Sequence, residues 1–109
     1  MEMTNGQRNR LIKKELTKKY GSDNVSVVGG MGAAYGWAEV YIYIEKPDSC
    51  YCKEGEVYCS ECGKELSKTR EEASKLIYAI PNIEFYTYNS DDGYNTESDC
   101  LSIQVSINN

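Results

Sequence analysis

The chain has 109 residues, a formal net charge of −5 and no histidine. Its length predicts a single domain, residues 1–109, with one modest hydrophobic core. Without histidine, Cys–His and Ser–His–Asp arrangements are excluded, so we expect no enzymatic activity. The acidic balance disfavours nucleic acid as a direct partner. No apolar run resembles a signal peptide or a membrane span, so we expect a cytoplasmic protein without a membrane partner.

The first predicted element is a helix from Thr4 to Tyr20. Thr4 and Gln7 form a capping box, and Gly21 supplies the C-terminal stop. The apolar side of this helix is predicted to carry Leu11, Ile12, Leu16 and Tyr20. The basic residues expected in solvent on its other side are Arg8, Arg10, Lys13, Lys14, Lys18 and Lys19.

Two strands are predicted next, over residues 25–29 and 37–45, and we expect them to form a hairpin. In the second strand, inward and outward residues alternate in the manner of a half-buried strand. The inward set is Ala38, Val40, Ile42 and Ile44. The glycine-rich segment 29–36 between the strands is followed by neither a lysine nor a helix, so it is interpreted as a hairpin connection rather than a phosphate-binding loop.

Four of the five cysteines lie close together after the second strand, at Cys50, Cys52, Cys59 and Cys62. Two close pairs separated by six residues can converge on one tetrahedral ion, and zinc is the metal that this ligand set favours. The Cys-x-x-Cys-Gly half is typical of a zinc knuckle, in which the glycine turns backbone amides toward the sulfurs. A disulfide pair, an iron site with the same four sulfurs and unliganded thiols are the alternatives.

The predicted zinc-binding loop spans residues 46–66. Its only aliphatic residues are Val57 and Leu66, so it cannot bury enough apolar surface to order itself. A structural zinc would order it, with apparent binding free energies of roughly 10–16 kcal/mol in small zinc peptides. Four cysteines fill every position of a tetrahedral site, which indicates a structural rather than a catalytic metal. The fifth cysteine, Cys100, is predicted to be a semi-buried residue outside the site.

A second helix is predicted to begin at Ser67 or Thr69 and to end before Pro81. Strands are predicted over residues 83–89 and 99–107, separated by a turn at Asp91, Asp92 and Gly93. The resulting order is helix, two strands, zinc loop, helix, two strands. It predicts an α+β fold with a four-stranded, mainly antiparallel sheet and both helices on one face.

Two surfaces are candidates for binding a partner. The acidic last third of the chain, with Asp91, Asp92 and Glu97, suits a basic protein surface. The open face of the predicted sheet would display aromatic residues of the kind enriched at interfaces. These residues are Trp37, Tyr41, Tyr43, Tyr86 and Tyr88. Ordinary solubilising charge and cross-strand aromatic pairing are the respective alternatives.

The segments LIKKELTKKY at 11–20 and YGWAEVYI at 35–42 resemble small proteins of mobile elements in Gram-positive bacteria. With the cysteine cluster added, the chain resembles a metal-binding type II-A anti-CRISPR protein. This resemblance implies a phage or mobile-element inhibitor that binds the RNA-guided nuclease of a type II-A system in the infected bacterium and blocks DNA loading or cleavage. The alternative hypothesis is a small zinc-knuckle module that binds nucleic acid or another host protein.

Overall fold

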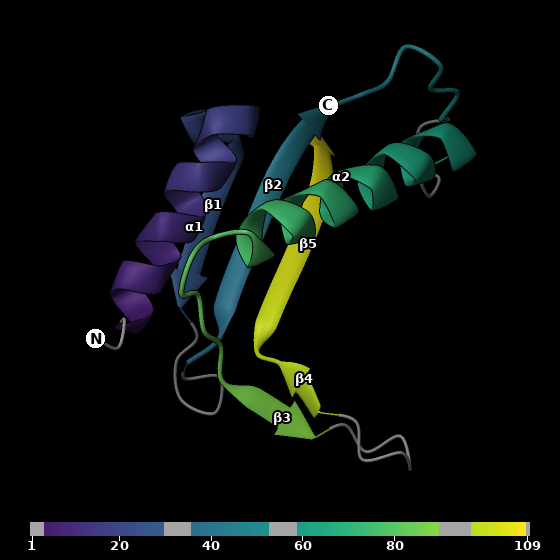
Figure 1. Cartoon of the computed structure of the whole chain (residues 1–109). Helices are drawn as coiled ribbons and strands as arrows, with labels where there is room; N and C mark the ends of the chain where they lie inside the picture. The colour runs from purple at the N-terminus through teal and green to yellow at the C-terminus, as the bar shows by residue number, and fades with distance from the viewer. Residues whose placement is uncertain (1–3, 30–35, 53–58, 90–96, 109) are drawn as a thin grey trace.

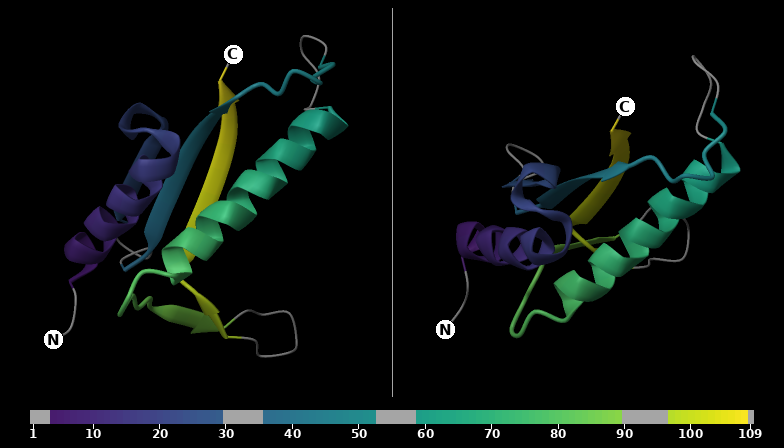
Figure 2. Two further views of the ribbon diagram at one scale, coloured as in Figure 1. Left: turned by 45° about the horizontal axis from the view of Figure 1, so that its top comes forward. Right: turned by 90° about the horizontal axis from the view of Figure 1, so that it is seen from above.

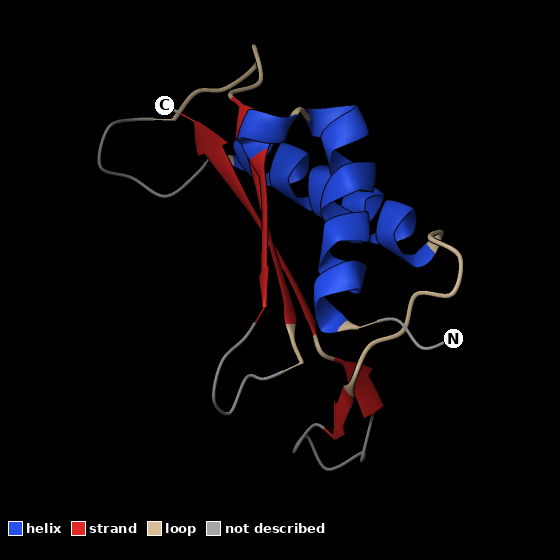
Figure 3. Cartoon of the chain, turned by 90° about the vertical axis from the view of Figure 1, so that its left-hand side faces the viewer, coloured by secondary structure: helices blue, strands red, loops and turns tan. Residues whose placement is uncertain are grey.

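The computed structural model of the chain describes residues 4–29, 36–52, 59–89 and 97–108. Figure 1 shows strands that are covered by two helices, and Figure 3 shows that both helices lie on the same face of the main sheet. The predicted α+β class is confirmed. The elements are α1 (Asn5–Tyr20), a 3-10 turn (Ser22–Asn24), β1 (Val25–Gly29), β2 (Ala38–Glu45), α2 (Ser60–Tyr78), β3 (Thr87–Asn89), β4 (Glu97–Asp99) and β5 (Leu101–Asn108).

Helix α1 has the predicted boundaries because local capping determines both of its ends. The Thr4 hydroxyl accepts a hydrogen bond from the Gln7 backbone N–H at 3.1 Å, and the Gln7 side chain accepts one from the Thr4 N–H at 3.0 Å. Gly21 ends the helix with φ 89°, a left-handed conformation that favours glycine. The predicted capping box and stop are therefore confirmed.

The main sheet has three strands in the order β1-β2-β5. β1 and β2 form the predicted antiparallel hairpin, but β5 runs parallel to β2, with Ala38 opposite Leu101 and Ile44 opposite Ile107. The predicted four-stranded, mainly antiparallel sheet is therefore wrong. Helix α2 carries the chain back to the end of the sheet at which β2 begins. A helical crossover of this kind allows two neighbouring strands to run parallel.

The last predicted strands are shorter than expected and do not all join the main sheet. The strand predicted over 83–89 is reduced to β3, which among the described strands pairs only with β4, in a separate two-stranded ribbon. The strand predicted over 99–107 is interrupted at Cys100. There the backbone N–H of Cys100 donates to the Tyr86 carbonyl at 2.6 Å, while its carbonyl accepts from Ala38 at 3.0 Å. Cys100 thus marks the point where the chain leaves the ribbon and enters the main sheet.

The hydrophobic core lies between the helices and the main sheet. It confirms the predicted inward orientation of Ala38, Val40 and Ile42, while Ile44 is half-buried. Full burial of one such aliphatic side chain contributes about 1.5–3 kcal/mol relative to exposure. The buried core residues are Ile12, Leu16, Val25, Ala38, Val40, Ile42, Ala73, Ile77, Ile80 and Val105.

Arg8 is buried, with 2% of its surface exposed, so its predicted place on a solvated basic face is wrong. Its Nη2 donates to the Gly36 carbonyl at 3.0 Å, and its guanidinium lies 5.2 Å from the centroid of the Phe85 ring. Burial lowers the pKa of Arg8, an effect that the nearby Tyr86 and Cys100 partly offset. The guanidinium therefore links α1 to the start of β2 and to the segment before β3.

Gly36, whose carbonyl binds Arg8, is a position where only glycine fits well. Its φ is 91°, and a Cβ built there would overlap the Tyr86 ring. The backbone conformation and the close ring each disfavour any larger residue. The Tyr86 ring and the Arg8 contact are thus brought together at the start of β2.

Candidate metal centre

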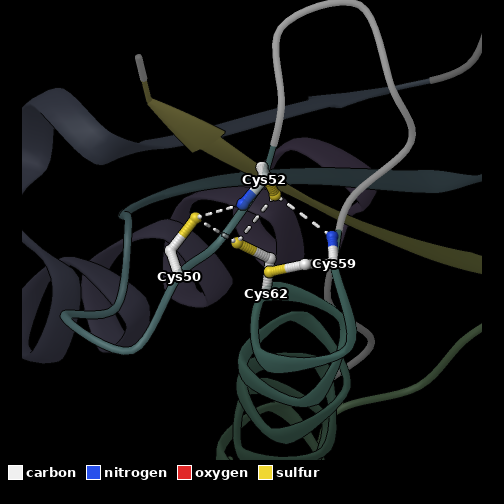
Figure 4. Close-up of side chains that lie close together, drawn as sticks. All are labelled: Cys50, Cys52, Cys59 and Cys62. Atoms are coloured by element: carbon white, nitrogen blue, oxygen red, sulfur yellow. Dashed lines mark hydrogen bonds between the residues drawn. The ribbon is translucent and has the colours of Figure 1, made fainter.

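The four clustered cysteines come from two consecutive segments of the chain, an irregular connection and the start of a helix. Cys50 and Cys52 lie in the connection after β2, whereas Cys59 is the N-cap of α2 and Cys62 lies in its first turn. The fold therefore brings one pair from an irregular segment against one pair on a helix end. Figure 4 shows the four side chains pointing toward one another.

Helix α2 begins at Ser60, well before the predicted start at Ser67 or Thr69. Gly63 is part of this helix, where its N–H donates to the Cys59 carbonyl at 2.9 Å, so the glycine turn of a zinc knuckle is not present. Glu61 and Lys64 form an ion pair at 3.6 Å on the first turn of α2. The acidic Glu61 also interacts favourably with the positive end of the helix dipole. The predicted loop 46–66 is thus partly helical.

The geometry of the sulfurs fits a tetrahedral metal ion. All four Sγ atoms lie within 4.8 Å of one another. The Cys62 Sγ is 3.3 Å from that of Cys50 and 3.5 Å from that of Cys52. Four sulfurs about 2.3 Å from a zinc ion would lie about 3.8 Å apart, so small shifts suffice. Both spacings exceed the roughly 2.05 Å of a disulfide bond, and the cysteines are free thiols.

Backbone N–H groups surround these sulfurs and stabilise negative charge on them. The Cys59 N–H donates to the Cys52 Sγ at 3.1 Å, and the Tyr51 N–H donates to the Cys59 Sγ at 3.4 Å. The Cys52 N–H lies 3.5 Å from the Cys50 Sγ (Figure 4). Such outer contacts orient metal ligands and favour their thiolate form.

Two side-chain contacts join the segment after β2 to the first turn of α2. The Tyr51 hydroxyl and the Ser60 hydroxyl are 2.6 Å apart, and the Ser49 hydroxyl donates to the Glu61 carboxylate at 3.3 Å. Our reading of the sequence did not include these residues in the site. Their positions directly beside the cysteines were the only signal available, since hydroxyl contacts of this kind have no characteristic spacing.

The thiols differ in their tendency to ionise. Burial opposes ionisation of Cys59. The backbone N–H groups of Cys62 and Tyr51, together with the thiols of Cys52 and Cys62, outweigh it and lower the pKa of Cys59 to about 6. Burial and the three neighbouring thiols raise the pKa of Cys62. For Cys52, the Cys59 N–H lowers the pKa, but burial and the thiols of Cys59 and Cys50 give a net increase. Cys59 is therefore ready to bind a cation as a thiolate near neutral pH.

Zinc binding near pH 7.5 is expected to release about two or more protons per ion, because Cys62 and Cys52 must lose protons that they hold in the free protein. Zinc affinity should then fall as pH decreases, since protons compete for the same sulfurs. A pH-indicator dye in weakly buffered solution measures this release. Cys62→Ser should release about one proton fewer. Zinc uptake without proton release would contradict binding by these thiols.

The aromatic residues predicted to bind a partner do not all lie on the main sheet. Tyr41 and Tyr43 lie on β2 of the main sheet and alternate with its buried residues. Tyr86 lies just before β3, outside either sheet, and Tyr88 lies on β3 in the two-stranded ribbon. The predicted display of five aromatic residues on one sheet face is therefore wrong. Trp37 lies just before β2 and is half-buried.

The acidic residues of the other predicted surface are only partly placed. Glu97 begins β4, in the ribbon with β3, whereas Asp91 and Asp92 fall outside the described residues. The proposed acidic surface therefore stays a prediction.

Comparisons with known proteins do not identify a relative. No protein-family model matches the chain, and neither a curated protein nor a solved structure matches it. Within the described residues, neither helix is long and apolar enough to cross a bilayer. The chemistry of the cysteine cluster therefore provides the main functional evidence.

Proposed function

We propose that Cys50, Cys52, Cys59 and Cys62 bind one zinc ion that has a structural role. The convergence of four sulfurs within 4.8 Å, with backbone N–H groups directed at three of them, is the observation that carries this proposal. Cysteine thiolates in a tetrahedral set favour zinc or iron, and zinc is the usual ion of closed structural sites. Metal analysis together with the absorption spectrum distinguishes them, because an iron–thiolate centre is coloured and a zinc centre is not.

The protein is further proposed to act by occupying the surface of a partner rather than by catalysis. Four sulfur ligands leave no open position on a tetrahedral zinc, and the chain has no histidine to serve as a general base. The zinc would instead hold the start of α2 against the segment after β2. In this proposal the zinc ion stabilises the structure of a protein that binds a partner, and it takes no part in a reaction.

As the partner, we propose the RNA-guided nuclease of a type II-A CRISPR system, which the resemblance of the sequence implies. Support comes from the net charge of −5, because such nucleases hold nucleic acid in a positively charged channel. Guided DNA cleavage measured with increasing amounts of the zinc-loaded protein tests this. Inhibition should saturate at about one inhibitor chain per nuclease complex. Undiminished cleavage at excess protein, or inhibition far below the stoichiometric ratio, would contradict the proposal.

The alternative, a zinc module that binds nucleic acid, rests on the basic residues of α1. Two of these residues are already paired, since Lys18 contacts Glu15 at 3.0 Å and Lys19 contacts Glu72 at 3.0 Å. Arg8 is buried. The positive charge available to phosphates on this helix is therefore smaller than the sequence suggests. A mobility shift with DNA or RNA at moderate salt should be negative if the protein is an inhibitor that binds protein.

A further inference from the structure

Strand β5 forms one edge of the main sheet, and within the described residues no strand pairs with its outer side. The backbone groups on that side can be assigned. The Ala38 N–H donates to the Cys100 carbonyl, and Ala38 is opposite Leu101 in the parallel register. Hydrogen bonds to β2 therefore involve Cys100 and the alternate residues after it. The N–H and C=O groups that point to the free edge belong to Leu101, Ile103, Val105 and Ile107.

This edge lacks the features that usually prevent strands from pairing between molecules. Natural edge strands are protected by charged residues, proline, bulges or short length. β5 is eight residues long, and its sequence LSIQVSIN contains no charged residue and no proline. The other edge, β1, is five residues long and is packed against α1. β5 is therefore the edge that is open to a further strand.

A shallow groove runs beside this edge, between α2 and the first half of β5. It has a volume of about 280 Å³ and is lined by Arg70, Ser74, Tyr78, Asp99, Leu101 and Ile103. Leu101 and Ile103 are only half-buried although they face the helix layer. Figures 1 and 2 show that the N-terminal half of α2 extends past β5, on the side away from β2 and near the C-terminal end of β5. The apolar residues of the groove, Leu101 and Ile103, and the N-terminal half of α2 thus lie at opposite ends of β5.

We propose that two copies of this chain associate through β5, in antiparallel pairing about a two-fold axis, to form a continuous sheet of order β1-β2-β5-β5-β2-β1. Antiparallel pairing places the C-terminal end of one β5 beside the N-terminal end of the other. The overhanging half of each α2 then covers Leu101 and Ile103 of the other copy. Opposed residues point to the same face, so the apolar residues of both strands stay in the helix layer.

The positions of the groove and of the overhanging helix half favour a second copy as the occupant of this edge, because a two-fold axis brings each against the other. The net charge of −5 on each chain opposes association, but β5 itself is uncharged, so the two strands meet without direct repulsion between their own side chains. Stable interfaces bury about 1,200–2,000 Å² in total, which is more than paired strand edges alone supply. Each α2 that extends over the opposite groove would add to this area, with Leu66 as the aliphatic residue of its first half.

Sedimentation velocity of the zinc-loaded full chain, from about 1 µM to about 1 mM, tests the proposal. We expect the mass to double within this range. Gln104→Lys places a charge on β5 without changing its backbone and should raise the dimer dissociation constant about tenfold or more. The matched control is Ser26→Lys on β1, which occupies the same row across the sheet, because Tyr41 pairs with both Ser26 and Gln104. This control should leave the dimer intact.

Ile103→Pro provides a second test, since it removes an N–H that points to the free edge and spares the bonds to β2. It should give a monomer with unchanged zinc content; if it does not fold, Gln104→Lys decides. A monomeric wild type at all concentrations overturns the proposal. So does a dimer that Gln104→Lys leaves intact or that Ser26→Lys disrupts. None of these readouts involves a nuclease, so they are independent of the proposed function.

Discussion

Replacing Cys59 and Cys62 together by serine is expected to abolish zinc binding and to lower the free energy of unfolding by about 2–5 kcal/mol. The variant loses both sulfurs that α2 contributes, including the buried Cys62. The remaining Cys50 and Cys52 are too few to complete a tetrahedral site. A chelator that removes zinc from the wild type should have a similar effect.

The loss should be concentrated at one end of α2. The fully buried core residues of this helix, Ala73 and Ile77, lie in its C-terminal half. Its N-terminal half contacts the core through the half-buried Leu66 and the rest of the chain through the cysteine cluster. Hydrogen exchange should therefore increase most over residues 59–68 and much less in β2 and β5. This pattern distinguishes a local structural metal site from one on which the entire core depends.

Metal analysis and denaturant unfolding provide the measurements, with Cys100→Ser as the matched control. Cys100 is buried where β5 begins and lies outside the group of four converging sulfurs. Its replacement should leave the zinc content unchanged. Full zinc occupancy in the Cys59→Ser, Cys62→Ser variant would show that these residues are not the ligands.

Arg8→Ala is expected to lower the free energy of unfolding by about 2–4 kcal/mol. The substitution removes the hydrogen bond to the Gly36 carbonyl and the guanidinium contact with the Phe85 ring. It also leaves a cavity and a carbonyl without this partner. Arg8→Lys should restore only part of the stability, because an ammonium lacks the planar shape that stacks on a ring.

Arg10→Ala is the control for this prediction. Arg10 lies on the exposed side of the same helix, where its Nε donates to the Gly6 carbonyl at 3.3 Å. Its loss should change stability by no more than about 0.5 kcal/mol. Urea unfolding of the three variants provides the comparison, and equal effects of Arg8→Ala and Arg10→Ala would refute a structural role for the buried guanidinium.

The sequence by itself determined the features that depend on neighbouring residues. The boundaries of α1 follow from Thr4, Gln7 and Gly21, and the β1–β2 hairpin follows from alternation along two adjacent segments. The closeness of the four cysteines also follows from their spacing, because each pair spans only a few residues. In all these cases the interacting groups are near each other in the chain, so few alternative arrangements compete.

The tertiary structure alone decided which distant segments meet. Leu101 to Ile107 has the alternation of a strand in either direction, and only the crossover through α2 makes β5 parallel to β2. The position of Arg8 on α1 predicted a side chain exposed to solvent. In the fold, its guanidinium instead contacts the Gly36 carbonyl and the Phe85 ring. Periodicity shows which residues share a face but carries no information on what will cover that face, because the partner is chosen by packing between segments far apart in the sequence.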